Sequence, residues 1–510
     1  MTVSQVREAF FQGDFERALA IADAVPTGDK AAGVELALLR ARTLIRVDQA
    51  DRAIEVLHAQ AFTEGGLDQR VTAQMLLGAA YVRLGQVERG TAMLREISDE
   101  AQDAHPTIRA ELALNLGIAW FRLHDYEKAS RCLGEVPSDA DIVYARALEY
   151  TGWVAQAQGD FPAAARAFHD ALVALRSSAH ADRYVEANVL YGLTMLVPEL
   201  LLVSDWALLE PWLRRFDWSV SGVARLRFWT LIAAAMMHEV LGNIPAARAA
   251  AREAESLAVD AGSRVVALCR LAATFRAVSE PEAHAEFLAR ARTAYETLNV
   301  RDLPADLRLL PLYLAEESVS GGEVDGAAAL LVRYREVVAP AANVPEREFA
   351  RWSAMADSIE ARIRHARDDD AGALPLFVSA FQTFSAQGYR RRAVALALLL
   401  ARLTAKKRYE RYAEEALCDV DPRYWMAREL ADLRGAGAPA LTPTESEILA
   451  MVVRGRTYKE IAAKRHVSWK TVGHHVQALF RKFGVRSRAE LAAEALRLRV
   501  VSVETRRNAS

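Results

Sequence analysis

A repeating pair of helices occupies most of this 510-residue chain and limits what it can fold into. In each unit one helix ends near a Gly or Asp, and an aromatic or aliphatic residue, a small residue and a bulky residue then follow in order. The small residue early in the second helix serves as the marker of each unit. The markers are Ala18, Ala53, Gly90, Ala129, Ala164, Ala207, Ala247, Ala283, Ala327 and Ala373, of which Ala207, Ala283 and Ala373 fit the pattern least well. They recur about every 39 residues, a period typical of helix-pair solenoids.

The marker pattern has a packing explanation. A small residue lets two antiparallel helices approach, and the bulky residue one turn later fills the gap to the next pair. No single pair can bury its apolar face, so the pairs have to stack into a superhelix. The pattern resembles the tetratricopeptide repeat (TPR) over most of residues 1–430, although no unit carries the full signature. The resemblance implies an all-α solenoid; a non-repetitive array of Ala-rich helices is the alternative.

Charge is divided unevenly along the chain. The whole chain has a formal net charge of −2, yet residues 440–510 hold 14 Lys and Arg against 6 Asp and Glu, and four of the eight lysines. A basic segment on an acidic body is typical of nucleic-acid binding, although many basic tails are merely solvated. Small, flexible residues at 435–440 predict a linker. We therefore predict a repeat domain at 1–434, a linker at 435–441, a second domain at 442–500 and a tail at 501–510.

Four short helices are predicted in the second domain. Capping boxes begin at Thr442, Thr457 and Ser487, Ser468 starts another helix, and Gly484 is suited to end it. The expected helices are 443–454, 458–465, 469–483 and 488–499, with one small apolar core. Only residues 465–467 separate the second helix from the third. Two helices joined by so tight a turn, the second long and basic, predict a helix-turn-helix.

These residues closely resemble the LuxR-type DNA-binding domain. The shared motifs are Lys459 to Ala462, Ser468 with Thr471 and Val472, His475, and Lys482 through Glu490. The resemblance implies a transcriptional regulator whose third helix enters the major groove of duplex DNA and whose fourth helix pairs across a twofold axis. Leu491 and Ala495 are therefore candidates for a homodimer interface. Gly473 departs from the family, which has a Lys or Glu facing the DNA at that position; a close approach of the backbone to DNA is the alternative explanation.

Side-chain chemistry divides the candidate DNA contacts into two groups. The base-contact candidates are Lys470, His474 and Gln477, because Gln can pair bidentately with adenine and Lys can donate to guanine. The phosphate-contact candidates are Thr457, Lys459, Ser468, Trp469, Thr471, Arg481, Lys482 and Arg488. A lid on the small core is an equal alternative for Trp469. His474 should face outward and His475 inward, and the pair is no metal site because neighbouring residues on a helix point apart.

Several functions are excluded by missing patterns. No G-x-x-x-x-G-K-[ST] motif occurs, and no alternation of strands and helices indicates a receiver domain. The three cysteines and the scattered histidines predict no metal site, no cofactor and no enzyme activity. No signal sequence or charge-free apolar span is found, so we expect a cytoplasmic bacterial protein, nucleoid-associated when bound.

The sequence thus predicts a LuxR-type regulator that binds double-stranded DNA as a dimer. Its TPR-like domain would sense a peptide, protein or small-molecule effector in its groove. Arg83, Arg122, Trp153 and Gln156 are the groove candidates, and ordinary helix packing or solvated surface is the alternative for each. The alternative function is a TPR-type interaction scaffold or anti-regulator whose helix-turn-helix has lost sequence-specific DNA binding.

Overall fold

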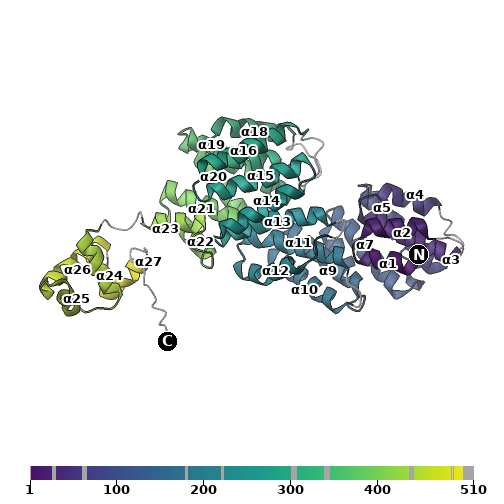
Figure 1. The fold of residues 1–510 in the computed structure, drawn as a ribbon, viewed down its shortest axis with the longest axis horizontal. Helices are drawn as coiled ribbons and strands as arrows, with labels where there is room; N and C mark the ends of the chain where they lie inside the picture. The colour runs from purple at the N-terminus through teal and green to yellow at the C-terminus, as the bar shows by residue number, and fades with distance from the viewer. Residues whose placement is uncertain are drawn as a thin grey trace. The chain divides into compact units, whose positions relative to one another are not determined.

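The computed structural model describes residues 2–25, 30–59, 66–178, 182–219, 223–299, 307–337, 345–435, 441–483, 485 and 487–497, and this part of the chain is all-α (Figure 1). It divides into two compact units, Met1–Ala393 and Val394–Ser510. Residues 436–440 of the predicted linker, Gly484, residues 498–500 and the tail at 501–510 lie outside the described residues, so the predicted domain boundaries stay predictions. No described helix is both long and apolar enough to span a bilayer.

Successive helices of the first unit pack as pairs, from α1 with α2 to α19 with α20 (Figure 1). The first helices of the pairs are α1 (Val3–Phe11), α3 (Lys30–Arg46), α5 (Leu67–Arg83), α7 (Pro106–Arg122), α9 (Ile142–Gln158), α11 (Arg183–Leu200), α13 (Ala224–Val240), α15 (Ala261–Arg276), α17 (Leu310–Ser320) and α19 (Glu346–Ala366). The second helices are α2 (Phe15–Ala24), α4 (Ala50–Ala59), α6 (Val87–Glu96), α8 (Tyr126–Gly134), α10 (Phe161–Ser177), α12 (Val203–Arg215), α14 (Ile244–Leu257), α16 (Pro281–Glu296), α18 (Val324–Val337) and α20 (Asp370–Ala386). The N-terminal domain is therefore TPR-like.

The turn inside each pair has a repeated backbone conformation. One residue with positive φ lies directly before the N-cap of the second helix, at Gly13, Asp48, Gly85, His124, Gly159, Leu201, Gly242, Ser279, Gly322 and Asp368. A single left-handed residue ends the first helix and reverses the chain within two residues. The N-cap that follows frequently accepts a hydrogen bond from the new helix, as Asp14 does from the Arg17 N–H.

In eight of the ten pairs the predicted marker lies four positions after the N-cap of the second helix, and its N–H bonds to the carbonyl of that residue. Eight of the ten predicted markers are buried at this position, including the poorly fitting Ala373. The prediction is wrong at Ala207, which is exposed, and at Ala283, which is half-buried. Trp206 and His284 occupy the buried position in these two pairs, with 2% and 5% of their surfaces exposed. A search for small residues missed them because both side chains are large.

At Gly90 the backbones of α5 and α6 lie very close together. A Cβ atom there would lie 2.5 Å from the Gly78 carbonyl oxygen and 2.8 Å from the Val82 nitrogen, both backbone atoms of α5. We expect Gly90→Ala to destabilise the domain by about 2 kcal/mol, because overpacking outweighs the better helix propensity of Ala. Urea unfolding followed by circular dichroism measures the change.

Gly134→Ala is the matched control for this prediction. Gly134 also lies in the second helix of a pair, but a Cβ atom there would meet nothing within 4 Å. The control should therefore be neutral or slightly stabilising. Equal unfolding midpoints for the two variants would show that α5 and α6 can separate without cost.

The second unit contains most of α21 (Arg390–Thr404), followed by α22 (Lys407–Ala416) and α23 (Trp425–Gly435). Its last four helices are α24 (Pro443–Val453), α25 (Tyr458–Arg465), α26 (Trp469–Phe483) and α27 (Arg488–Arg497). They agree with the predicted helices to within one residue wherever the ends are described. Their apolar faces form one core, which includes Ile448, Ile461, Val472 and Leu479.

Candidate DNA-binding site

Helix α26 begins directly after a tight turn, and this turn sets its direction. Helix α25 ends at His466, whose φ of 53° is left-handed, and the Val467 N–H bonds back to the Ala462 carbonyl. Ser468 then caps α26, because its Oγ accepts a hydrogen bond of 3.1 Å from the Thr471 N–H. The predicted turn between the second and third helices is confirmed. Helices α25 and α26 form the helix-turn-helix.

One face of α26 is apolar and the opposite face is polar. Val472, Val476 and Leu479 are fully buried against α24, α25 and α27. The three base-contact candidates, Lys470, His474 and Gln477, are all exposed on the polar face, while His475 is half-buried as expected. A helix anchored by one face and polar on the other is the arrangement that major-groove reading requires.

Trp469 is an exposed apolar residue at the start of α26. Its side chain is 56% exposed, and it is not among the residues packed on the core of the domain. The Lys470 ammonium lies 6.0 Å from the centroid of its ring. The structure therefore does not support the alternative in which Trp469 is a lid on the core, and a contact with DNA sugar or phosphate stays a prediction.

The cationic phosphate-contact candidates fall into two groups. Lys459 and Arg481 are exposed and have no acidic partner among the described residues. Lys482 instead bonds to Glu445, with 2.6 Å between Nζ and Oε2. Arg488 donates to the Arg456 carbonyl and lies over the Tyr458 ring. Lys482 and Arg488 therefore hold the domain together within the protein, whether or not they also reach DNA.

The hydroxyl candidates belong to helix caps. Thr457 Oγ1 accepts from the Glu460 N–H, and the Glu460 carboxylate accepts from the Thr457 N–H at 2.6 Å, so the predicted capping box is confirmed. Ser468 Oγ and Thr471 Oγ1 lie 2.8 Å apart and share a hydrogen bond. These hydroxyls are exposed at the starts of α25 and α26, where a phosphate would also meet the positive end of each helix.

Glu445 completes the predicted capping box at Thr442 and also forms an ion pair with Lys482 that the sequence did not reveal. Its Oε2 accepts from the Thr442 N–H at 2.8 Å in the first capping box and from Lys482 of α26 at 2.6 Å. The hydrogen bond from Lys482, followed by that from the Thr442 backbone, lowers the pKa of Glu445 to about 2. One carboxylate thus caps α24 and ties it to the C-terminal end of α26.

Lys464 is a candidate phosphate contact that the sequence analysis did not include. It is exposed near the end of α25 and has no acidic partner among the described residues. In a helix-turn-helix the first helix crosses the phosphate backbone, so a free lysine on α25 is well placed for this contact. The concentration of lysines in this segment was the available signal.

Leu491 and Ala495 lie inside the domain. Both are fully buried and belong to the core that α27 shares with α24 and α26. The prediction that these two residues form the dimer interface is therefore wrong, because a dimer contact needs exposed side chains and these are covered by their own domain. The spacing that places them on one face of α27 comes from packing within the domain. A dimer through α27 would have to use another face, on which Ala492 is half-buried.

Gly473 leaves open space on the polar face of α26. A Cβ atom at this position would meet nothing within 4 Å. We expect Gly473→Lys to tighten binding to duplex DNA of any sequence about tenfold at low salt, because it adds a cation and removes a flexible residue from the helix. Fluorescence anisotropy with a labelled duplex measures the change.

Gly473→Ala separates the two explanations of this glycine. It adds one methyl group, and we expect it to stabilise α26 without weakening DNA binding. Weaker binding of both the Ala and the Lys variants would show instead that the glycine backbone itself lies against DNA.

The groove candidates of the N-terminal domain are partly brought together. Arg83 and Arg122 both lie near the Tyr150 phenol, and Arg83 pairs with Asp48 with 2.6 Å between Nε and Oδ1. Arg122 is exposed without an acidic partner among the described residues. Trp153 packs edge-on against Phe168 at 4.9 Å, which is ordinary helix packing.

The other polar groups near Tyr150 were missed in the sequence. Arg46 binds Asp182 at 3.1 Å, and burial raises the pKa of Glu149 to about 7 although Arg146 and Arg46 oppose the shift. Arg46, Arg83 and Arg122 end α3, α5 and α7, so each lies seven residues before its marker. An arginine at a fixed repeat position was the signal that could have found Arg46.

Gln156 is the fourth groove candidate. It lies near the end of α9, and its Oε1 is buried without a hydrogen-bond partner in the described part of the chain. A buried amide oxygen of this kind calls for a bound water or ligand group. Within the described residues, no group of three or more His, Cys, Asp or Glu side chains could hold a metal ion.

The fold and this site define a helix-turn-helix domain, and comparison with known proteins gives its family. The model of the luxR family of bacterial regulatory proteins matches residues 439–495. The spore germination protein GerE of Bacillus subtilis (strain 168) is 38% identical over 60 residues, which are 12% of this chain and 81% of GerE. The chain therefore belongs to the luxR family of bacterial regulatory proteins.

The similarity to other relatives is confined to the same domain. The probable transcriptional regulatory protein NarL of Mycobacterium tuberculosis (strain ATCC 25618 / H37Rv) is 38% identical over 76 residues, 15% of this chain. The chain spans 35% of the length of NarL. The methanol utilization control regulatory protein MoxX of Paracoccus denitrificans is 36% identical over 80 residues, and the chain spans 36% of it.

Solved helical-repeat structures resemble the larger part of the chain only distantly. A Rap protein complexed with competence and sporulation factor has 12% identity and a TM-score of 0.47, covering 79% of this chain and 99% of that one. The apo form of the quorum sensor NprR from B. thuringiensis has 14% identity and a TM-score of 0.38, covering 81% of this chain and 97% of that one.

Proposed function

We propose that this protein regulates transcription by binding duplex DNA as a dimer, with α26 in the major groove. The observation that carries the proposal is the polar face of α26. Lys470, His474 and Gln477 are exposed on this face, while the opposite face of the helix is buried in the core of the domain. Lys459, Lys464 and Arg481 add cations without acidic partners among the described residues, and they are available for phosphates.

The same proposal assigns signal sensing to the TPR-like domain. The effector is a peptide, a protein or a small molecule that binds the polar groups around Tyr150 and alters DNA binding or dimer formation. The guanidinium of Arg122, which lies near Tyr150 and has no acidic partner among the described residues, supports a ligand there. Mass spectrometry of the protein purified from its native host would identify a retained effector.

Two experiments with the full-length protein test the DNA proposal: a selection of bound genomic fragments, and a salt series on the selected site. The selection should enrich inverted repeats with half-sites about one helical turn apart. The slope of log K against log salt should be about −3 for each protomer, since Lys459, Lys464 and Arg481 each displace about one counterion when they neutralise a phosphate. Mass photometry of the complex gives the number of protomers.

The alternative function is an interaction scaffold that no longer reads DNA sequence. Gly473 favours it, as does the use of Lys482 and Arg488 for contacts within the domain. A flat salt response without enriched fragments would reject the regulator and favour this alternative.

A further inference from the structure

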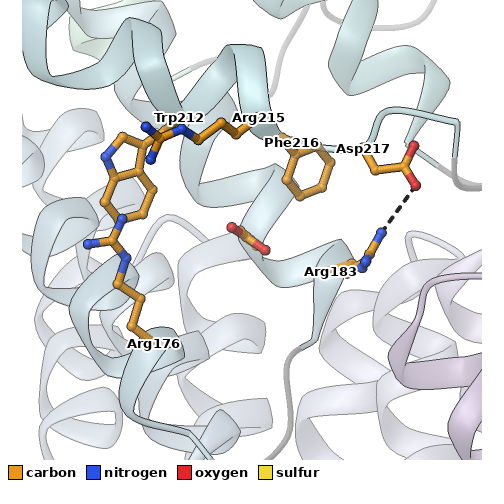
Figure 2. A pocket seen from close by; sticks show the side chains of 7 residues that line it. Arg176, Arg183, Trp212, Arg215, Phe216 and Asp217 are labelled. Atoms are coloured by element: carbon orange, nitrogen blue, oxygen red, sulfur yellow. Dashed lines mark hydrogen bonds and ion pairs between the residues drawn. The ribbon is translucent and has the colours of Figure 1, made fainter.

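A pocket of about 310 Å³ lies between the end of α10, the start of α11 and the end of α12, and none of its lining residues is among the groups named around Tyr150 (Figure 2). This volume is at the lower end of the range for small-molecule sites. Trp212 and Phe216 give the pocket its apolar surface. Arg176, Arg183 and Arg215 reach it from three different helices.

The arginines of this pocket are incompletely neutralised. Arg183 has an acidic partner, Asp217, at 3.3 Å, but both side chains are about half exposed, so the pair is weak. Arg215 and Arg176 have no acidic partner among the described residues. Glu186 also lines the pocket but forms no ion pair within 4 Å in the described part of the chain, and burial raises its pKa although Arg183 and Arg176 oppose the shift. The pocket therefore has an excess of positive charge.

Trp212 joins the positive and apolar parts of the pocket. The Arg176 guanidinium lies 3.2 Å from the centroid of the indole ring. Arg215 is three residues after Trp212 on α12 and thus its neighbour on the helix surface. Figure 2 shows the Arg215 and Arg176 side chains both beside Trp212, with Phe216 farther along the pocket. Two guanidiniums next to one aromatic ring leave a place for an anionic group attached to a flat apolar one.

We propose that this pocket binds a small aromatic anion. Its carboxylate or phosphate would bond to Arg176 and Arg215, and its ring would pack against Trp212 and Phe216. Guanidinium groups suit both anions because they can donate two parallel hydrogen bonds. The site does not depend on DNA binding or on the groups around Tyr150, so it can be tested separately from the proposed function.

Calorimetry with the full-length protein tests this site. The probes are benzoate and phenyl phosphate, with benzyl alcohol as the neutral probe of similar shape. We expect saturable binding of one ligand per chain for at least one of the anions, and none for benzyl alcohol. Arg215→Ala should weaken the binding about tenfold, because it removes a charge-assisted bidentate contact. The tighter of the two anions identifies the group that the pocket prefers.

Arg214→Ala is the matched control. Arg214 is the preceding residue of α12, but it is exposed, pairs with Glu210 at 2.6 Å and does not line the pocket. This variant should bind the anion as the unaltered protein does. No saturable binding of either anion, equal losses in the two arginine variants, or equal binding of benzyl alcohol would each overturn the proposal. Equal melting temperatures of the variants exclude misfolding as the cause of a loss.

Discussion

Replacing Glu445 by Ala is expected to lower the stability of the helix-turn-helix domain by about 3 kcal/mol. The change removes the carboxylate that accepts the hydrogen bond from the Thr442 N–H in the capping box of α24. It also removes the carboxylate that pairs with the Lys482 ammonium. Losing a cap costs about 1 kcal/mol, and losing an ion pair whose carboxylate is buried but whose lysine side chain is 35% exposed adds about 2 kcal/mol, less than a fully buried pair would. Hydrogen exchange of the α24 and α26 amides in the full-length protein measures the loss.

Glu460→Ala is the matched control, since Glu460 completes an identical capping box at the start of α25. Glu460 is exposed, and in the described part of the chain its ion-pair partner is Arg456 of the adjoining turn. Its removal should increase exchange near α25 and leave α26 protected. The double variant Glu445→Ala with Lys482→Met should be no less stable than Glu445→Ala alone. Independent, additive losses would show that the two side chains do not stabilise one another.

Acid should have the same effect as Glu445→Ala. The pKa of Glu445 is about 2 in the folded domain against an ordinary value of 4.5. The unfolded chain therefore binds a proton more readily, so this stabilisation is complete above about pH 4.5 and is lost as the pH falls toward 2. The Glu445→Ala variant should lack this part of the acid sensitivity.

Gln477→Ala is expected to weaken binding to the selected DNA site by about 1–3 kcal/mol and to relax the preference at one base pair. Gln477 is exposed on the polar face of α26, one turn beyond Gly473, where a bidentate bond to adenine can form. Arg481→Ala is the comparison. Removing this exposed cation should weaken binding to all DNA sequences alike and reduce the salt slope by about one. Binding curves on the selected site and on its single-base variants measure both effects. Equal losses on every sequence for both variants would mean that α26 is oriented differently on the DNA.

The C-terminal domain was largely predictable because its signals are local. Capping boxes, a tight turn and apolar residues at helical spacing each act within one or two turns of helix, so the chain specifies them without reference to distant residues. The four helices and their core agree with the prediction. Leu491 and Ala495 show the limit of this reasoning. The apolar spacing on α27 predicts a buried face but does not say whether a partner subunit or the same domain covers that face. In the structure the core of the same domain covers it.

The repeat domain was predictable in its period but not in its exceptions. Backbone reversal by one left-handed residue and close helix packing favour a small residue at a fixed position, and eight units obey this rule. Trp206 and His284 break it, since both of these large side chains are buried at the position of the small residue, and only three-dimensional packing decides where a large side chain fits.

The sequence by itself determined the helix boundaries of the C-terminal domain, the repeat period and the basic helix-turn-helix, since these depend on residues close together in the chain. The tertiary structure alone decided which charges are free and which are paired. Lys482 pairs with Glu445, which lies 37 residues away in the sequence, and Arg46 pairs with Asp182, which lies 136 residues away. Coulombic and hydrogen-bonding partners are set by distance in space, and the folding of the chain brings them within reach.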